Sequence, residues 1–212
     1  EGAVLRAVHA VCPVEGGRLQ SEVQGVVRGA AGDRAGDARR PAARRRTGAR
    51  HSNVQRARGL AGPLIAFARL RRLDLLPQIF EHVFITHTVM AECTGRANSP
   101  EDLFIREAID KKHLELCLSP DFSVLARSID AGEASVIAVA IAQKCGVLID
   151  DKAGRKTAAN LDIPVIGTVG VLVLAKRKAF VSRIKPLLEQ LVASGYFLGA
   201  EIVAAALASC DE

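Results

Sequence analysis

The stretch GVLIDDKAGRKTAANLDIPVIGT, residues 146–168, is the part of the sequence that decides the predicted fold. Two short apolar runs, at residues 147–149 and 164–166, enclose a polar segment of helical length. Short continuous apolar runs are typical of strands that are buried on both faces of a sheet. A helix between two such strands brings them together in parallel. The stretch therefore predicts a strand, a helix and a second, parallel strand.

The same alternation continues on both sides of this stretch. Further strands are predicted at residues 82–86 and 114–118, and helices at residues 62–80, 87–95, 99–113, 130–146, 169–178, 181–194 and 200–209. One helix start is signalled clearly, because Ser99 is followed by Pro100 and two acidic residues. The pattern favours an α/β fold, a three-layer α/β/α domain with a parallel central sheet, over residues 60–212.

A segment of different composition precedes this predicted domain. Residues 1–59 contain twelve Arg, no Lys and five acidic residues, whereas residues 60–212 carry 17 basic and 18 acidic residues. Such an Arg-, Ala- and Gly-rich segment buries too little apolar surface to fold, so we expect a disordered leader. Three interpretations of it stay open: a nucleic-acid-binding arm at residues 39–46, a tail without a selected role, or GC-rich DNA read out of frame.

Several protein classes are not indicated by the composition. No apolar run approaches the roughly 20 residues of a membrane-spanning helix, and the first residues do not resemble a signal peptide. The five cysteines are scattered without C-x-x-C spacing, which argues against a disulfide framework and against a zinc site. We therefore expect a protein of the reducing cytoplasm that does not enter a membrane.

Carboxylates gather where the predicted strands end or the next helices begin. Asp150 and Asp151 follow the strand at 147–149, at the edge of the sheet where α/β proteins form their sites. One of them would serve as a helix N-cap, and the pair could equally ligate a metal ion. Asp130 and Glu133 fit a capping box, and Glu92 fits a solvated helix face, unless the fold brings these acids together. A cluster of oxygen ligands without His or Cys would suit Mg²⁺ or Mn²⁺.

Three motifs occur in a characteristic order: D-x-G-E-A at residues 130–134, I-D-D-x-x-G-R at 149–155 and G-T-x-G-x-L-x-x-A-K at 167–176. With these motifs, the chain from Ala61 to about Val203 resembles the PIN-domain family, in its bacterial and archaeal branch. The resemblance implies a metal-dependent ribonuclease, such as the VapC-type toxin of a toxin–antitoxin pair, whose carboxylates hold Mg²⁺ or Mn²⁺. It also implies an RNA substrate, a cognate antitoxin and a homodimer.

The resemblance assigns metal-ligating carboxylates to this chain by position: Glu92, Asp130, Glu133, Asp150 and Asp151. Glu92 would be the second family carboxylate and Glu133 the third, with Asp130 in support. The fourth is Asp150 or Asp151, and the sequence leaves both open. Arg155 and Lys156 would meet the phosphate of the RNA, or else lie on a solvated helix face.

The first family carboxylate is missing. The family begins with an apolar strand that ends in Asp, but here Leu60 occupies the Asp position and the preceding residues 52–59 are polar. A reading-frame change just before Leu60 would explain both losses, and this stays a hypothesis. Without this Asp we expect weak nuclease activity. Without the strand we expect two unpaired sheet edges, unless residues 23–27 supply a substitute strand. The alternative is a non-catalytic pseudo-nuclease that binds an antitoxin or nucleic acid.

Overall fold

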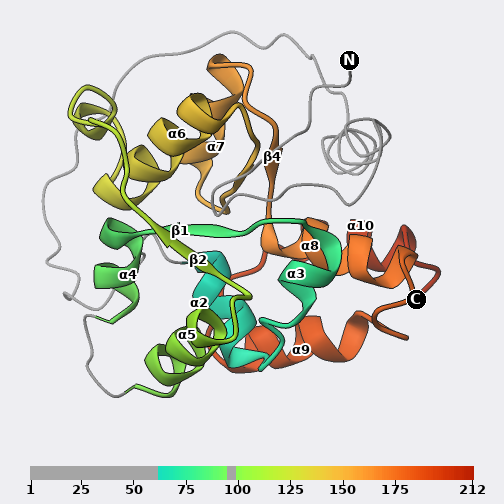
Figure 1. The fold of residues 1–212 in the computed structure, drawn as a ribbon. Helices are drawn as coiled ribbons and strands as arrows, with labels where there is room; N and C mark the ends of the chain where they lie inside the picture. The colour runs from blue at the N-terminus through green and yellow to red at the C-terminus, as the bar shows by residue number, and fades with distance from the viewer. Residues whose placement is uncertain (1–61, 95–98) are drawn as a thin grey trace, which may run out of the picture.

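The structure, a computed structural model, describes residues 62–94 and 99–212 (Figure 1). The predicted leader at residues 1–59, Leu60 and the substitute strand at 23–27 therefore lie outside the described residues. No helix in the described part of the chain is both long and apolar enough to cross a bilayer.

Strands and helices alternate along the described chain as the sequence predicts. The strands are β1 (Phe84–Thr86), β2 (Glu115–Cys117), β3 (Val147–Leu148) and β4 (Val165–Ile166). The α-helices are α2 (Gly62–Arg69), α3 (Leu75–Ile79), α4 (His87–Cys93), α5 (Pro100–Asp110), α6 (Ala131–Gln143), α7 (Lys152–Asn160), α8 (Thr168–Arg177), α9 (Lys185–Ala193) and α10 (Ala200–Ala208). A short 3₁₀ helix, η1 (Leu125–Arg127), precedes α6. The α/β class of the fold is thereby confirmed.

The largest differences from the predicted helix boundaries lie before α3 and at the start of α9. The expected helix at 62–80 is two helices, because Arg71 between them adopts a positive φ of 55°, which a helix cannot continue. The resulting bend buries both Leu70 and Leu73 in the core. The helix expected from residue 181 begins only at Lys185, with Pro186 in its first turn, where the missing proline N–H costs nothing.

The strands form two parallel pairs. Phe84 of β1 lies opposite Glu115 of β2, and Val147 of β3 lies opposite Val165 of β4. Within the described residues no strand joins these two pairs, so the central sheet of the prediction is present only as two halves.

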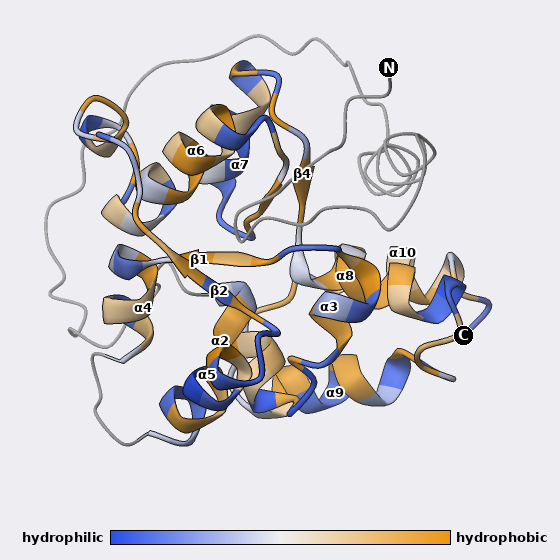
Figure 2. Cartoon of the chain, viewed as in Figure 1, coloured by the Kyte–Doolittle hydropathy of each residue, from blue (hydrophilic) through white to orange (hydrophobic). Residues whose placement is uncertain are grey.

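The helix α6 connects the two halves of the sheet. It packs against both β1 and β3, and its residues from Gly132 to Ala140 are all buried. A buried hydrogen bond of 2.8 Å between the hydroxyls of Thr86 and Ser135 fastens α6 to the end of β1. Figure 1 shows α6 and α7 on one side of β1 and β2, and α2, α5 and α9 on the other. In Figure 2 the strands and α8 are mostly hydrophobic, whereas α7 is mostly hydrophilic.

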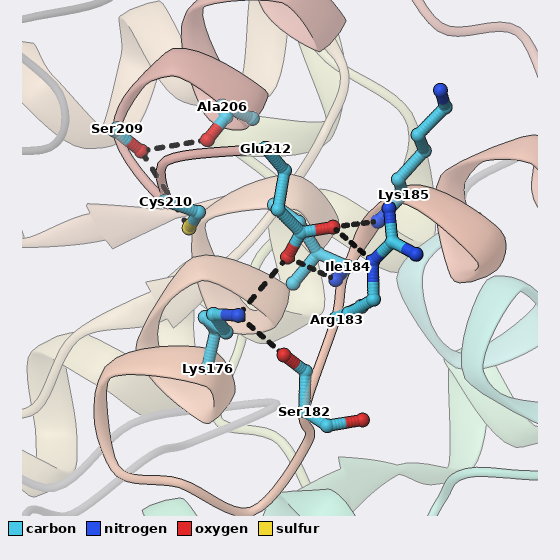
Figure 3. Close-up of polar contacts among 9 residues, drawn as sticks. All are labelled: Lys176, Ser182, Arg183, Ile184, Lys185, Ala206, Ser209, Cys210 and Glu212. Atoms are coloured by element: carbon cyan, nitrogen blue, oxygen red, sulfur yellow. Dashed lines mark hydrogen bonds and ion pairs between the residues drawn. The ribbon is translucent and has the colours of Figure 1, made fainter.

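Glu212, after α10, connects the C-terminal helices through its side chain. The Glu212 carboxylate accepts hydrogen bonds from the backbone N–H groups of Ile184 and Lys185, at 2.8 and 3.0 Å (Figure 3). It also pairs with Lys176 at 3.3 Å and Arg183 at 3.7 Å. The side chain is only 4% exposed. The open N–H groups at the start of α9 are thus satisfied by a carboxylate 27 or 28 residues away.

Candidate acidic site

Asp151 is the N-cap of α7. One of its carboxylate oxygens, Oδ2, accepts hydrogen bonds from the N–H groups of Ala153, at 2.6 Å, and Gly154, at 3.3 Å. An N-cap carboxylate also interacts favourably with the positive end of the helix dipole. The capping interpretation of the Asp150–Asp151 pair therefore holds for Asp151.

The side chain of Asp150 turns to other partners, at the start of α8. Its Oδ1 accepts from the Thr168 N–H at 2.9 Å, and its Oδ2 accepts from the Thr168 hydroxyl and the Tyr196 hydroxyl, each at 2.5 Å. A Cβ at position 167 would lie 2.6 Å from Oδ1, so the Asp150 carboxylate can occupy this position only because residue 167 is glycine. Sequence reasoning missed Tyr196, because nothing in the local pattern links it to a residue 46 positions away.

Glu133 is buried between α6 and α7. It lies in the first turn of α6 and is 4% exposed. A Cβ at position 154 would come within 2.7 Å of its carboxylate, so Gly154 lets α7 approach α6 at this point. Burial, followed by the charges of Asp151, Asp130 and Glu92, raises the pKa of Glu133 to about 7.

Glu92 points its carboxylate at the first turn of α6. A Cβ at position 132 would lie 2.5 Å from Glu92 Oε2, which places this oxygen directly over Gly132. Oε2 is buried and has no hydrogen-bond partner among the described residues. Burial raises the pKa of Glu92, and the charge of Asp130 raises it further. A hydrogen bond from the backbone N–H of Gly132 offsets part of this increase. The carboxylate thus lies against α6 rather than on a solvated face.

Asp130 is exposed at the N-cap position of α6, but its side chain makes no capping hydrogen bond. The capping box considered for Asp130 and Glu133 is therefore not formed. Asp130 instead adds its negative charge to those around Glu92 and Glu133.

The two basic candidates beyond the acids have different surroundings. Arg155 is half-buried, and its Nη1 donates a 3.0 Å hydrogen bond to the carbonyl of Ile149 at the end of β3. The same Nη1 would lie 2.9 Å from a Cβ at Gly167. Lys156 is exposed on α7. Arg155 therefore has a structural contact at the site, and Lys156 is open to solvent.

Four acids from α4, α6 and α7 thus make up an acidic cluster: Glu92, Asp130, Glu133 and Asp151. The possible metal ligands of this cluster are all carboxylate oxygens, which suit a hard divalent cation such as Mg²⁺ or Mn²⁺. Among them, Glu92 Oε2 has no hydrogen-bond partner in the described residues, and the Glu133 carboxylate is buried. The number of ligands falls short, however. No three acidic, His or Cys side chains in residues 62–94 and 99–212 come close enough to hold a metal ion.

Comparison with known proteins identifies the family of the chain. A family model described as a PIN domain matches residues 61–212, which is well over half of the chain. No curated protein and no solved structure matches the chain. The matched residues contain the two parallel strand pairs, α6 and every member of the acidic cluster. The chain therefore belongs to the PIN-domain family.

Proposed function

We propose that this PIN domain is a Mg²⁺- or Mn²⁺-dependent ribonuclease of the toxin–antitoxin type, with activity impaired by the loss of its first carboxylate. The observation that supports it most is the buried Glu133 carboxylate, which is surrounded by the charges of Glu92, Asp130 and Asp151. Buried like charges that repel one another destabilise a fold unless a proton or a cation compensates for them. A site that binds a divalent cation is one reason for a chain to keep such a cluster.

Glu92 and Glu133 would hold the cation, with Asp130 and Asp151 completing its surroundings. Gly132 and Gly154 leave the space in which the two glutamate carboxylates lie. When bound, the cation would activate a water molecule and stabilise the negative charge that develops on the scissile phosphate. The exposed Lys156 of α7 would contact the phosphate backbone of the RNA.

Leu60 is the reason for expecting impaired catalysis. A leucine side chain offers no ligand to Mg²⁺, and no three acidic, His or Cys side chains of the described residues come together at a metal-binding distance. The second candidate function follows from the same observation: a pseudo-nuclease that keeps the fold and binds an antitoxin or nucleic acid without cleaving it. Titration with Mn²⁺ separates the two, because only the nuclease requires binding of the ion.

The decisive test is a ribonuclease assay with Mn²⁺ on the wild type, Leu60→Asp and Leu60→Asp/Glu133→Gln. We expect weak EDTA-sensitive cleavage by the wild type and an increase of about tenfold or more in Leu60→Asp, since each lost interaction of about 1.4 kcal/mol changes a rate tenfold. Glu133→Gln should abolish this gain. Full-rate cleavage by the wild type would show that Leu60 does not impair the site. No cleavage and no Mn²⁺ binding by any variant would favour the pseudo-nuclease.

A further inference from the structure

The two adjacent aspartates after β3 have separate surroundings. Asp151 caps α7 and accepts a bond from the N–H of Gly154, the residue against which the Glu133 carboxylate lies. Asp150 faces Thr168 and Tyr196 instead. Asp151 is among the charges that act on Glu133, whereas Asp150 is not. The two neighbours therefore belong to two different groups of side chains.

The Asp150 carboxylate has one lone pair, on Oδ1, that its hydrogen bonds do not use. Its Oδ2 accepts from two hydroxyls and its Oδ1 accepts from a backbone N–H. A carboxylate oxygen offers about two lone pairs, so Oδ2 is fully used. Hydrogen bonds to an ionised carboxylate are also about twice as strong as bonds between neutral groups, and a cation would have to displace them.

Tyr196 connects this carboxylate to two other parts of the fold. It lies in the segment between α9 and α10, and it is the only tyrosine of the chain. A Cβ at Gly62, the first residue of α2, would lie 3.2 Å from the Tyr196 hydroxyl. Burial and the neighbouring Asp150 raise the pKa of Tyr196, so the phenol remains a hydrogen-bond donor at neutral pH. The hydroxyl thus lies between the end of β3, the start of α8 and the start of α2.

We propose that Asp150 is a positioning residue rather than a metal ligand: held by Thr168 and Tyr196, it fixes the turn between β3 and α7 so that Asp151 faces Glu133. The identity of the ion rests on the function proposed above. The contacts that fix Asp150 join groups of the protein itself, so they can be tested separately from the ion.

Calorimetric titration with Mn²⁺ is the first test, on Asp150→Asn, Asp150→Ala, Asp151→Asn and Tyr196→Phe. The amide introduced by Asp150→Asn keeps an oxygen that can accept hydrogen bonds, so this variant should hold the Mn²⁺ affinity within about threefold of the wild type. Asp150→Ala should weaken it by about tenfold, as loss of outer supporting contacts commonly does, and Tyr196→Phe by less. Asp151→Asn should weaken it by tenfold or more. Equal losses in Asp150→Asn and Asp151→Asn would overturn the proposal, since they would make Asp150 a ligand.

Thermal melting in EDTA is the second test and needs no metal. Tyr196→Phe and Asp150→Ala should each lower the melting temperature by roughly 2–4 °C, and the double variant should fall no further than Asp150→Ala alone. Additive losses would overturn the proposal. Should Asp150→Ala not fold, Tyr196→Phe is compared with the wild type alone, and an unchanged melting temperature would overturn the proposal.

Two variants serve as matched controls. Ser194→Ala removes a hydroxyl from the same segment that bonds only the Leu191 carbonyl of its own helix. Asp162→Asn removes an exposed carboxylate at the far end of α7. Neither should change the Mn²⁺ affinity. If the wild type itself binds no Mn²⁺, the proposed function fails, and the melting data alone decide whether Tyr196 and Asp150 are coupled.

Discussion

At the scale of single residues, the site depends on two glycines that face carboxylates. Gly132 faces Glu92 and Gly154 faces Glu133, and in both cases a Cβ would lie under 3.0 Å from a carboxylate oxygen. Both glycines lie within helices, where Ala is intrinsically favoured by about 1 kcal/mol. Space for the carboxylates is therefore the physical reason for glycine at these positions.

Replacing Gly154 by Ala should separate metal binding from stability. The new methyl group must displace the Glu133 carboxylate, so we expect the Mn²⁺ affinity to fall by about tenfold or more. The melting temperature should change by only a few degrees, because the gain in helix propensity offsets part of the strain. Calorimetry and thermal melting measure the two effects. Gly199→Ala is the control, since its Cβ would meet only Ile202 at 3.8 Å, and an unchanged affinity in Gly154→Ala would refute the close contact.

Glu133 should also make the metal-free protein less stable as the pH rises. Its pKa of about 7 in the folded state lies above the ordinary value of 4.5, so the folded state binds a proton that the unfolded chain has released. Between about pH 4.5 and 7 the unfolding free energy should therefore fall with increasing pH, by up to about 3 kcal/mol. Glu133→Gln should remove most of this slope.

Denaturant unfolding in EDTA at several pH values measures this effect. Burial also raises the pKa of Glu92. Glu92 therefore contributes a pH dependence of stability with the same sign, and this part remains in Glu133→Gln. Asp162→Asn, the exposed-carboxylate control, should keep the wild-type slope. A wild type whose stability is constant across this pH window would contradict the burial of an ionisable Glu133.

At the scale of elements, the start of α9 depends on Glu212. Burial raises the pKa of its carboxyl, but the N–H groups of Ile184 and Lys185 and the ammonium of Lys176 outweigh this and lower it. A carboxyl with a lowered pKa contributes stability above its unfolded pKa and loses it as the pH falls through the folded value. The contribution of Glu212 should therefore be complete at neutral pH and be lost progressively as the pH falls below the ordinary carboxyl pKa of 4.5.

Glu212→Ala should lower the melting temperature at pH 7 by a few degrees, and Glu212→Gln by less because the amide oxygen can still accept hydrogen bonds. The difference between Glu212→Ala and the wild type should shrink at pH 3.5. The neighbouring Asp211→Asn is the control, because Asp211 is exposed and its positive φ of 56° also suits Asn. Equal melting temperatures of wild type and Glu212→Ala at pH 7 would rule out this contribution.

At the scale of the whole molecule, the described strands form two separate parallel pairs, and the sequence of residues 52–59 contains no apolar run. On the interpretation that the Arg-rich leader has no role in the fold, deleting residues 1–59 should leave the melting temperature within about 2 °C of the full chain. A larger fall would instead support a strand from residues 23–27.

Sequencing the coding DNA across codons 40–65 tests the frame hypothesis, which requires another frame to encode an apolar strand ending in Asp.

Much of this protein follows from its sequence, where the determinants are local. The alternation of apolar runs and helical segments predicts the α/β class, because the spacing of apolar residues within a strand or helix shows which of its faces is buried. The N-cap at Ser99 is confirmed, since its hydroxyl accepts from the Asp102 N–H at 3.2 Å, three residues along the chain. The positions of the acids at strand ends and helix starts are equally local.

Contacts between distant residues were decided only by the tertiary structure. The sequence left Asp150 and Asp151 equivalent, and their different surroundings arise because Thr168 and Tyr196 reach Asp150 from 18 and 46 residues away. Glu92 meets Gly132, and Glu212 meets the start of α9, for the same reason. Local propensities carry no information about which helices pack together, so these contacts follow from the burial of the core as a whole.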